Sequence, residues 1–168
     1  MPEYVDVVDD DDNVVGKATR EECHWKRLLH RSVQFFIFDK DGRILVNRRS
    51  SSKEFFKGMW SIVLGGHVAS GDTYDDTVVR EALEEAGVAS KPFRMGFFKK
   101  RLPEERENVA VYGFIADGKP KLLAEEIDLG EFMTVEEAEK LMTKESFLPE
   151  TGQLLPILKQ YLFNKRGS

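Results

Sequence analysis

Two apolar runs joined by a short turn limit most strongly how this chain can fold. Residues 33–38 (VQFFIF) and 44–47 (ILVN) are rich in aromatic and β-branched side chains, and residues 39–42 (DKDG) separate them. An Asp-Gly pair between apolar runs is a strong signal for a β-hairpin. Because the runs carry so few polar residues, we expect two adjacent strands of a buried sheet, which other layers must cover.

A helix follows Thr73. Thr73 and Asp76 are spaced as in a capping box, and Gly87 supplies a stop signal. Apolar residues at helical spacing between these ends form the expected buried stripe: Val79, Ala82, Leu83 and Ala86.

The remaining pattern alternates strands, helices and long connections. The expected elements are a hairpin over 4–8 and 14–18, a loop over 50–71, strands over 93–101 and 109–116, and helices over 134–142 and 154–163, the last with Pro156 near its first turn. This order predicts one α/β (α+β) domain over residues 1–168, a mixed sheet with helices on its faces, in which residues 1–30 form an N-terminal hairpin extension.

Composition excludes several classes of protein. The chain has 168 residues and a formal charge of −5, from 25 Lys plus Arg against 30 Asp plus Glu, which argues against general nucleic-acid binding. No apolar run approaches the roughly 18 residues of a membrane span, and the N-terminal residues lack the basic and apolar start of a signal peptide. With Cys23 as its one cysteine, the sequence predicts a cytoplasmic protein.

Three acidic residues gather on one face of the expected helix. Glu81, Glu84 and Glu85 stand at i, i+3 and i+4, so their side chains lie on neighbouring turns. Acids in the last turns oppose the helix dipole, and like charges four residues apart repel, at roughly 0.2 to 1 kcal/mol for each effect. A bound divalent cation such as Mg²⁺ would make both electrostatic interactions favourable. From spacing alone, ordinary exposed glutamates remain the alternative.

Residues 66–88 (GHVASGDTYDDTVVREALEEAGV) resemble the Nudix box, a 23-residue family pattern of high specificity. The matching positions are Gly66, Arg80, Glu81, Ala82, Glu84, Glu85, Gly87 and Val88. One position departs from the pattern, because Asp72 stands where the family has Glu. That position usually pairs with the box arginine, so the shorter acid is expected to weaken a contact with Arg80.

The resemblance implies a Nudix fold, with a mixed sheet between helices and the box as a loop, helix and loop. It also implies Mg²⁺- or Mn²⁺-dependent cleavage of a nucleoside diphosphate linked to another group. By this resemblance the metal ligands are Glu81, Glu85 and a backbone carbonyl at Gly65 or Gly66. Glu84 is either a further ligand or a group that positions water, and Arg80 orients the glutamates.

The general base lies outside the box in this family, so the resemblance does not fix it. The candidates are Glu104, Glu105 and Glu107 on the expected loop after Arg101, with Glu125 or Glu126 as the fallback. For each of them, an ordinary surface role is the alternative.

A looser similarity over residues 3–116 links the chain to the isopentenyl-diphosphate isomerase branch of the same fold. It rests on His30-Arg31, Asp41-Gly42, Arg48-Arg49, Lys53, Gly58 and Trp60. By this resemblance Arg49 and Lys53 contact the substrate diphosphate, and His30 and His67 bind metal. The alternatives are a solvated basic loop and histidines with packing roles.

The catalytic pair of the isomerases is missing. Their cysteine position is Gly65 here, and their glutamate position is Val109. Cys23 does not replace the cysteine, since it falls next to His24, where the isomerases carry an early metal-binding histidine. A second metal site from His30, His67 and either His24 or Glu107 stays an open alternative.

The sequence therefore predicts a Mg²⁺-dependent hydrolase that cleaves the phosphoanhydride of a small, nucleoside-linked diphosphate. Two alternatives remain: an isopentenyl-diphosphate isomerase-like enzyme, and a regulatory module that binds nucleotide without turnover. The resemblance also allows a homodimer, because dimers are common in the family.

Overall fold

The computed structural model describes residues 2–53 and 55–167, so residues 1, 54 and 168 of the expected domain lie outside the described part. The strands are β1 (Tyr4–Val8), β2 (Val14–Thr19), β3 (His30–Phe38), β4 (Ile44–Arg49), β5 (Trp60–Ser61), β6 (Leu64–His67), β7 (Phe93–Arg101), β8 (Arg106–Ile115) and β9 (Ile127–Met133). The helices are α1 (Arg20–Lys26), α2 (Tyr74–Ala86), α3 (Val135–Met142) and α4 (Thr151–Arg166).

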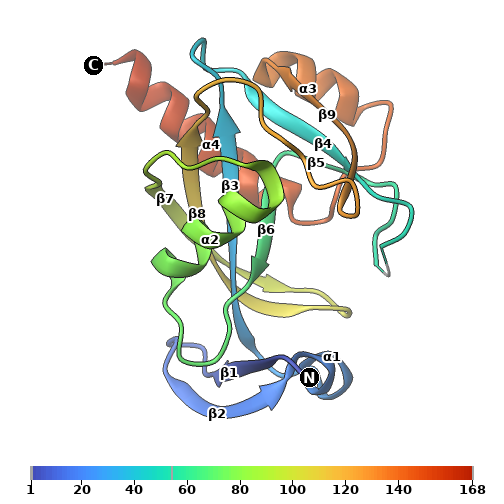
Figure 1. Cartoon of the computed structure of the whole chain (residues 1–168), viewed down its shortest axis with the longest axis vertical. Coiled ribbons are helices and arrows are strands. Elements are labelled where there is room, and N and C mark those ends of the chain that lie inside the picture. Colours follow the sequence, from blue (N-terminus) through green and yellow to red (C-terminus); the bar gives the residue numbers. More distant parts are fainter. Residues whose placement is uncertain (1, 54, 168) are drawn as a thin grey trace.

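Strand β3 organises the sheet (Figure 1). Along one edge it pairs in parallel with β8, from His30 opposite Glu107 to Phe38 opposite Ile115. Along the other edge it pairs with β6 and then with β4, and β1 meets its first residue. The sheet extends through β7 beyond β8 and through β5 and β9 beside β4, which makes it the expected mixed sheet.

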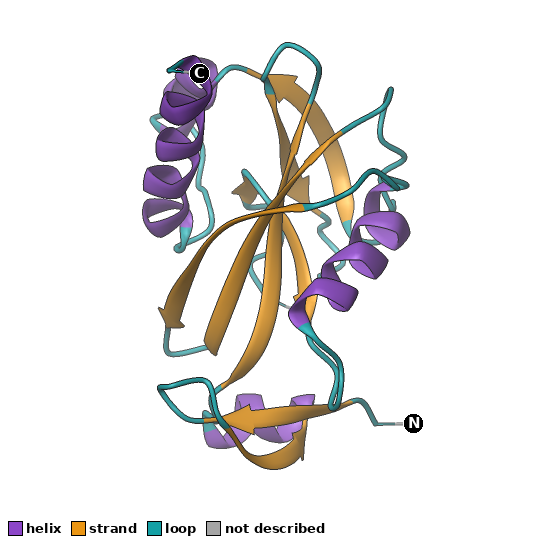
Figure 2. Ribbon diagram, turned by 90° about the vertical axis from the view of Figure 1, so that its left-hand side faces the viewer, coloured by secondary structure: helices purple, strands orange, loops and turns teal. Residues whose placement is uncertain are grey.

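Helices cover both faces of this sheet (Figure 2). Alternate residues of β3 point to opposite sides, so Val33, Phe35 and Ile37 pack toward α2, whereas Phe36 and Phe38 pack toward α3 and α4. The expected sandwich of helix, sheet and helix is therefore present. None of the described helices combines the length and the apolar character needed to cross a bilayer.

Helix α2 has the expected ends but a different buried face. The Thr73 hydroxyl accepts a hydrogen bond from the Asp76 amide (3.0 Å), and Gly87 ends the helix at φ 64°. Val79 and Leu83, expected in the buried stripe, are exposed, because the helix is rotated so that Thr77 and other residues face the sheet. That buried face is Thr77, Val78, Ala82 and Ala86. Its two alanines let the helix backbone approach the sheet closely.

Three further expectations are wrong in detail. Residues 60–67 form β5 and β6 inside the expected loop, because both segments pair with strands already in the sheet. Strand β9 pairs along β4 although its sequence gave no clear strand signal. Helix α4 begins at Thr151, so Pro156 lies beyond its first turn.

Candidate functional site

A cavity of about 310 Å³ lies where β3 and β6 meet α2 and the loops before β5 and β9. We call it the α2 cavity. Charged and polar side chains from several segments line it, among them Gln34, Arg49, Lys53, His67, Glu81, Glu85, Lys100, Glu105, Glu107, Glu126 and Glu150. Many of these side chains are candidate site residues predicted from the sequence, and they come from segments far apart along the chain.

Glu81 lies against the backbone of Gly66. A Cβ atom built on Gly66 would lie 2.5 Å from Cδ and 2.7 Å from Oε1 of Glu81, well inside contact distance. The absence of a side chain at position 66 therefore lets the Glu81 carboxylate approach the β6 backbone, whose carbonyl groups are the expected additional oxygen ligands.

Glu85 is the most strongly perturbed acid of α2. Burial, followed by the charges of Glu81 and Glu126, raises its pKa to about 8, and its Oε2 atom is buried without a hydrogen-bond partner. Burial and Glu84 also raise the pKa of Glu81. Two desolvated carboxylates with an unpartnered oxygen are a donor set that suits a hard divalent ion such as Mg²⁺, so the residues fit the metal that the Nudix box implies.

The other two box residues lie outside the cavity. Glu84 is exposed and does not line it, although the sequence nominated it as a ligand. Arg80 donates a hydrogen bond to Asp72 (3.2 Å), so the shorter acid still pairs with the box arginine. The Arg80 charge also acts on Glu81, where it lowers the carboxyl pKa against the effect of burial.

The two expected diphosphate ligands line the same cavity and are engaged with protein groups. The Arg49 guanidinium donates to the carbonyl of Phe55 through Nε (3.3 Å) and Nη2 (3.1 Å). Lys53 forms an ion pair with Glu126, which comes from the loop that precedes β9. Both cations can therefore reach a ligand that also contacts Glu81 and Glu85.

A second group of possible metal ligands lies at the end of β3. One ligand atom from each of His30, His67 and Glu107 falls within 4.8 Å of the others. Glu107 Oε2 lies 2.9 Å from His67 Nε2 and 3.4 Å from His30 Nε2, while Ser32 donates to Oε1 (3.0 Å). His24 is not part of this group, since its Nδ1 lies 2.9 Å from the carbonyl of Glu104.

Glu107 is not the exposed loop residue that the sequence predicted. It belongs to β8 and is 3% exposed, because the strand begins at Arg106. Although burial opposes ionisation, the His30 and His67 side chains hold its pKa well below the usual range. Its place beside the two imidazoles makes Glu107 a candidate ion ligand as well as a candidate general base.

Sequence reasoning missed a buried ionic cluster beside Glu107. Lys100, 5% exposed, pairs with Glu105, Glu107 and Glu150, and Gln34 donates to Glu150 (3.1 Å). Burial lowers the Lys100 pKa, but the three carboxylates together raise it. Lys100 sits in an ordinary strand pattern and Glu150 precedes a helix that was expected to start later, so neither gave a signal.

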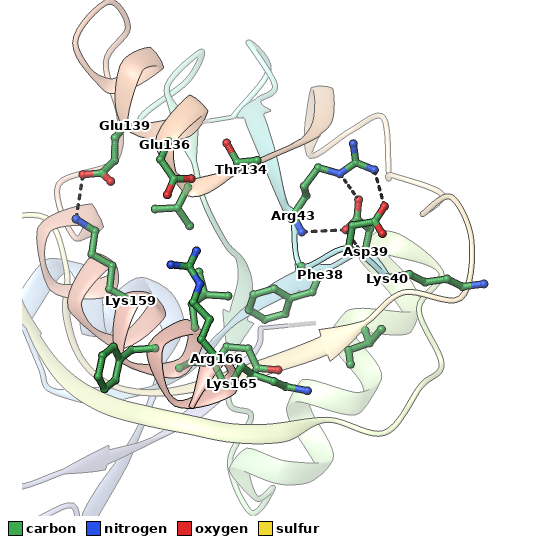
Figure 3. Close-up of a pocket in the computed structure, with 17 residues that line it drawn as sticks. Phe38, Asp39, Lys40, Arg43, Thr134, Glu136, Glu139, Lys159, Lys165 and Arg166 are labelled. Atoms are coloured by element: carbon green, nitrogen blue, oxygen red, sulfur yellow. Dashed lines mark hydrogen bonds and ion pairs between the residues drawn. The ribbon is translucent and has the colours of Figure 1, made fainter. Parts of the chain in front are cut away.

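A larger cavity, about 690 Å³, lies at the other end of β3 (Figure 3). Residues of the β3–β4 turn, α3 and α4 line it, and none belongs to the Nudix box. Several of its charges pair with each other, as Arg43 does with Asp39 (2.7 Å) and Lys159 with Glu139 (3.0 Å). The smaller α2 cavity is therefore the candidate active site.

Comparisons with known proteins identify the family of the chain. The NUDIX domain pattern matches residues 28–154. An uncharacterized Nudix hydrolase of Yersinia pestis is 38% identical over 136 residues, 80% of this chain and 75% of that protein. A prenyl-diphosphate phosphatase of Methanosarcina mazei is 33% identical over 156 residues, 91% and 89% of the two chains.

The same fold occurs in a crystal structure from Deinococcus radiodurans, of the protein DR0079. It superposes with a TM-score of 0.78 at 28% identity, and the alignment covers 92% of this chain and 98% of that one. Together, the box, the domain match and the shared fold show that this chain belongs to the Nudix hydrolase family.

Proposed function

We propose that the chain hydrolyses the phosphoanhydride bond of a small, nucleoside-linked diphosphate with the help of Mg²⁺ or Mn²⁺. The observation that carries the proposal is the meeting of Glu81 and Glu85 with Arg49 and Lys53 in one cavity. Carboxylates that suit a divalent ion and cations that suit a phosphate together match a metal-bridged diphosphate.

Each residue has a separate task in this proposal. Glu81, Glu85 and a carbonyl of Gly65 or Gly66 hold the ion, with Glu84 as an outer ligand or water-positioning group. The ion, when bound, neutralises the diphosphate and lowers the pKa of a bound water. Arg49 binds phosphate oxygens in the bidentate manner of guanidinium groups.

The wall of the cavity favours a polar substrate over a prenyl chain. One relative is named a prenyl-diphosphate phosphatase, which makes a prenyl diphosphate the competing substrate class. The lining, however, carries Gln34, Lys100 and Glu150, all charged or hydrogen-bonding groups. Placing a hydrocarbon chain against them costs desolvation without a compensating hydrogen bond, whereas a ribose or a base can replace those bonds.

The isomerase alternative lacks room for its chemistry. A Cβ atom on Gly65 would lie 2.5 Å from the carbonyl oxygen of Val33, so a cysteine does not fit this backbone. Val109, at the other catalytic position, is fully buried in the core. Neither position can supply an acid or a base.

A second ion fits the His30, His67 and Glu107 group, whose two imidazoles and one carboxylate are ligands that Mn²⁺ and Zn²⁺ accept. Counting bound Mn²⁺ by calorimetry tests this part of the proposal. We expect two ions on the wild-type protein and one on H67A; one ion on both proteins would contradict a second site.

Screening nucleoside diphosphate derivatives, prenyl diphosphates and isopentenyl diphosphate with Mg²⁺ tests the substrate class. We expect phosphate or monophosphate release from nucleotide substrates and no dimethylallyl diphosphate. Faster release from the prenyl diphosphates would contradict the assignment to nucleotides, and tight nucleotide binding without turnover would support the regulatory alternative.

A further inference from the structure

An ion pair inside the α2 cavity joins Lys53, a cation that suits a phosphate, to Glu126, a carboxylate that suits a metal ion. Lys53 follows β4 and Glu126 precedes β9, and their side chains pair across the mouth of the site. Their side chains are 24% and 33% exposed, so both remain within reach of a ligand. No other described residue forms an ion pair with either of them.

The backbone around Glu126 is fixed to the box helix. The Leu123 amide donates to the carbonyl of Glu85 (2.9 Å), and the Glu126 amide donates to the carbonyl of Leu123 (2.9 Å). From the other side, the Ser50 amide donates to the carbonyl of Glu126 (2.9 Å). Glu126 is therefore held at a set place beside Glu85, and only its side chain is free to change partner.

Glu126 already acts electrostatically on the carboxylates of α2. Its charge raises the pKa of both Glu81 and Glu85, while Lys53 and Arg49 lower the pKa of Glu85. All five side chains line the same cavity. The site therefore contains a third carboxylate from outside the helix, which Lys53 neutralises while no substrate is bound.

A diphosphate would compete with Glu126 for Lys53. It carries more negative charge than one carboxylate, and contacts with Arg49 would place it beside the same ammonium group. Once Lys53 has turned to phosphate, Glu126 has lost its ion-pair partner beside two acids, and a divalent ion held by those acids is a positive charge that can replace it.

We propose that Glu126 is a substrate-coupled ligand of the metal site, which Lys53 withholds in the free protein and releases when the diphosphate binds. The inference rests on the proposed function, since it assumes that Glu81 and Glu85 hold the ion. It goes further by coupling metal affinity to occupation of the diphosphate site, so that the complete ion site forms only with substrate present.

A double-mutant cycle on Mn²⁺ binding to the substrate-free protein tests this coupling, with H67A in every variant so that the second ion site does not contribute. K53M should raise Mn²⁺ affinity because it frees Glu126, by about tenfold, which corresponds to ~1.4 kcal/mol. Loss of a positive charge alone also raises affinity, but that part is the same in every background. We therefore expect a much smaller gain, about twofold, when K53M is added to E126Q.

Glu125 supplies the matched control, since it is the exposed acidic neighbour of Glu126. K53M should give its full gain in the E125Q background. An equal gain in the E126Q and wild-type backgrounds, or loss of the gain with E125Q, would overturn the inference.

Failure of the proposed function gives a different result, because then H67A and H67A/E85Q, which both lack the second ion site, bind Mn²⁺ equally poorly. Thermal melting checks that each variant is folded, and K53Q with E126A repeats the cycle if one of the first variants is not.

Discussion

The Glu81 carboxylate packs on the backbone of Gly66, where a Cβ atom would lie 2.5 Å from its Cδ. This contact joins the first residue of the Nudix box to its first glutamate, which are fifteen positions apart in sequence. It gives a spatial reason for a glycine at the start of the box, since any side chain there would push the carboxylate away from β6.

Replacing that glycine should damage the site more than the fold. G66A should lower kcat/KM at least about tenfold by displacing Glu81, with an overpacking cost of roughly 1–3 kcal/mol in stability. G152A is the control, because nothing lies within 4 Å of a Cβ on that exposed glycine of α4. Turnover by G66A at the wild-type rate would show that the contact has no role in activity.

The raised pKa of Glu85 predicts how stability depends on pH in EDTA. The folded protein keeps a proton on this carboxyl up to a pKa of about 8, whereas the unfolded chain loses it near 4.5. The contribution is therefore fully present below pH 4.5 and is lost as pH rises toward 8, at about 1.4 kcal/mol for each pKa unit. Urea unfolding at pH 5 and pH 8 measures it.

E85Q is the comparison for that experiment, since an amide does not ionise. Its stability should fall less between pH 5 and pH 8 than that of the wild-type protein, and Mg²⁺ should restore wild-type stability at pH 8. Parallel pH profiles for the two proteins would mean that Glu85 is already ionised in the metal-free fold.

The Lys100 cluster should be a large contributor to stability. K100M removes the cation that pairs with Glu105, Glu107 and Glu150, and uncompensated buried carboxylates typically cost 3–5 kcal/mol. K99M, at the exposed neighbouring position, should change the melting temperature little. If the two variants melt together, the cluster contributes nothing net to folding.

Arg49 should affect substrate affinity more than folding. R49M removes the guanidinium that lines the α2 cavity, so KM for a diphosphate should rise by roughly tenfold or more, as expected for a lost charge-assisted contact. R43M is the control, because Arg43 pairs with Asp39 and Asp41 at the far end of β3. An unchanged KM for R49M would remove it from the diphosphate site.

Local signals in the sequence predicted the elements that carry strong patterns. The hairpin from β3 to β4, the ends of α2 and the acids Glu81 and Glu85 all follow from residues close together in the chain. The features that the sequence did not predict depend on contacts between residues far apart in the chain. Glu107 became buried because β8 starts at Arg106 and pairs with β3, and the partners of Glu107 come from β3, β6 and β7.

The same limit explains why the Lys100 cluster was missed. Its members come from β7, the β7–β8 turn, β8 and the residue before α4, and a lysine in a strand normally indicates a solvent-facing position. The rotation of α2 was missed for a related reason, since Val79 and Leu83 fit an apolar stripe as well as Val78 does. Ala82 and Ala86 belong to both stripes, and only packing against the sheet buries Val78 with them and leaves Val79 and Leu83 exposed.

Mg²⁺-dependent turnover of nucleoside diphosphate derivatives by wild type, E85Q and E84Q tests the central claim most directly. Glu85 is half-buried and lines the cavity, whereas Glu84 is exposed and lies outside it. We expect E85Q to lose roughly a hundredfold or more of kcat while remaining folded, and E84Q to lose less. Wild-type turnover by E85Q, or turnover that persists unchanged in EDTA, would contradict a metal-dependent hydrolase built on this helix.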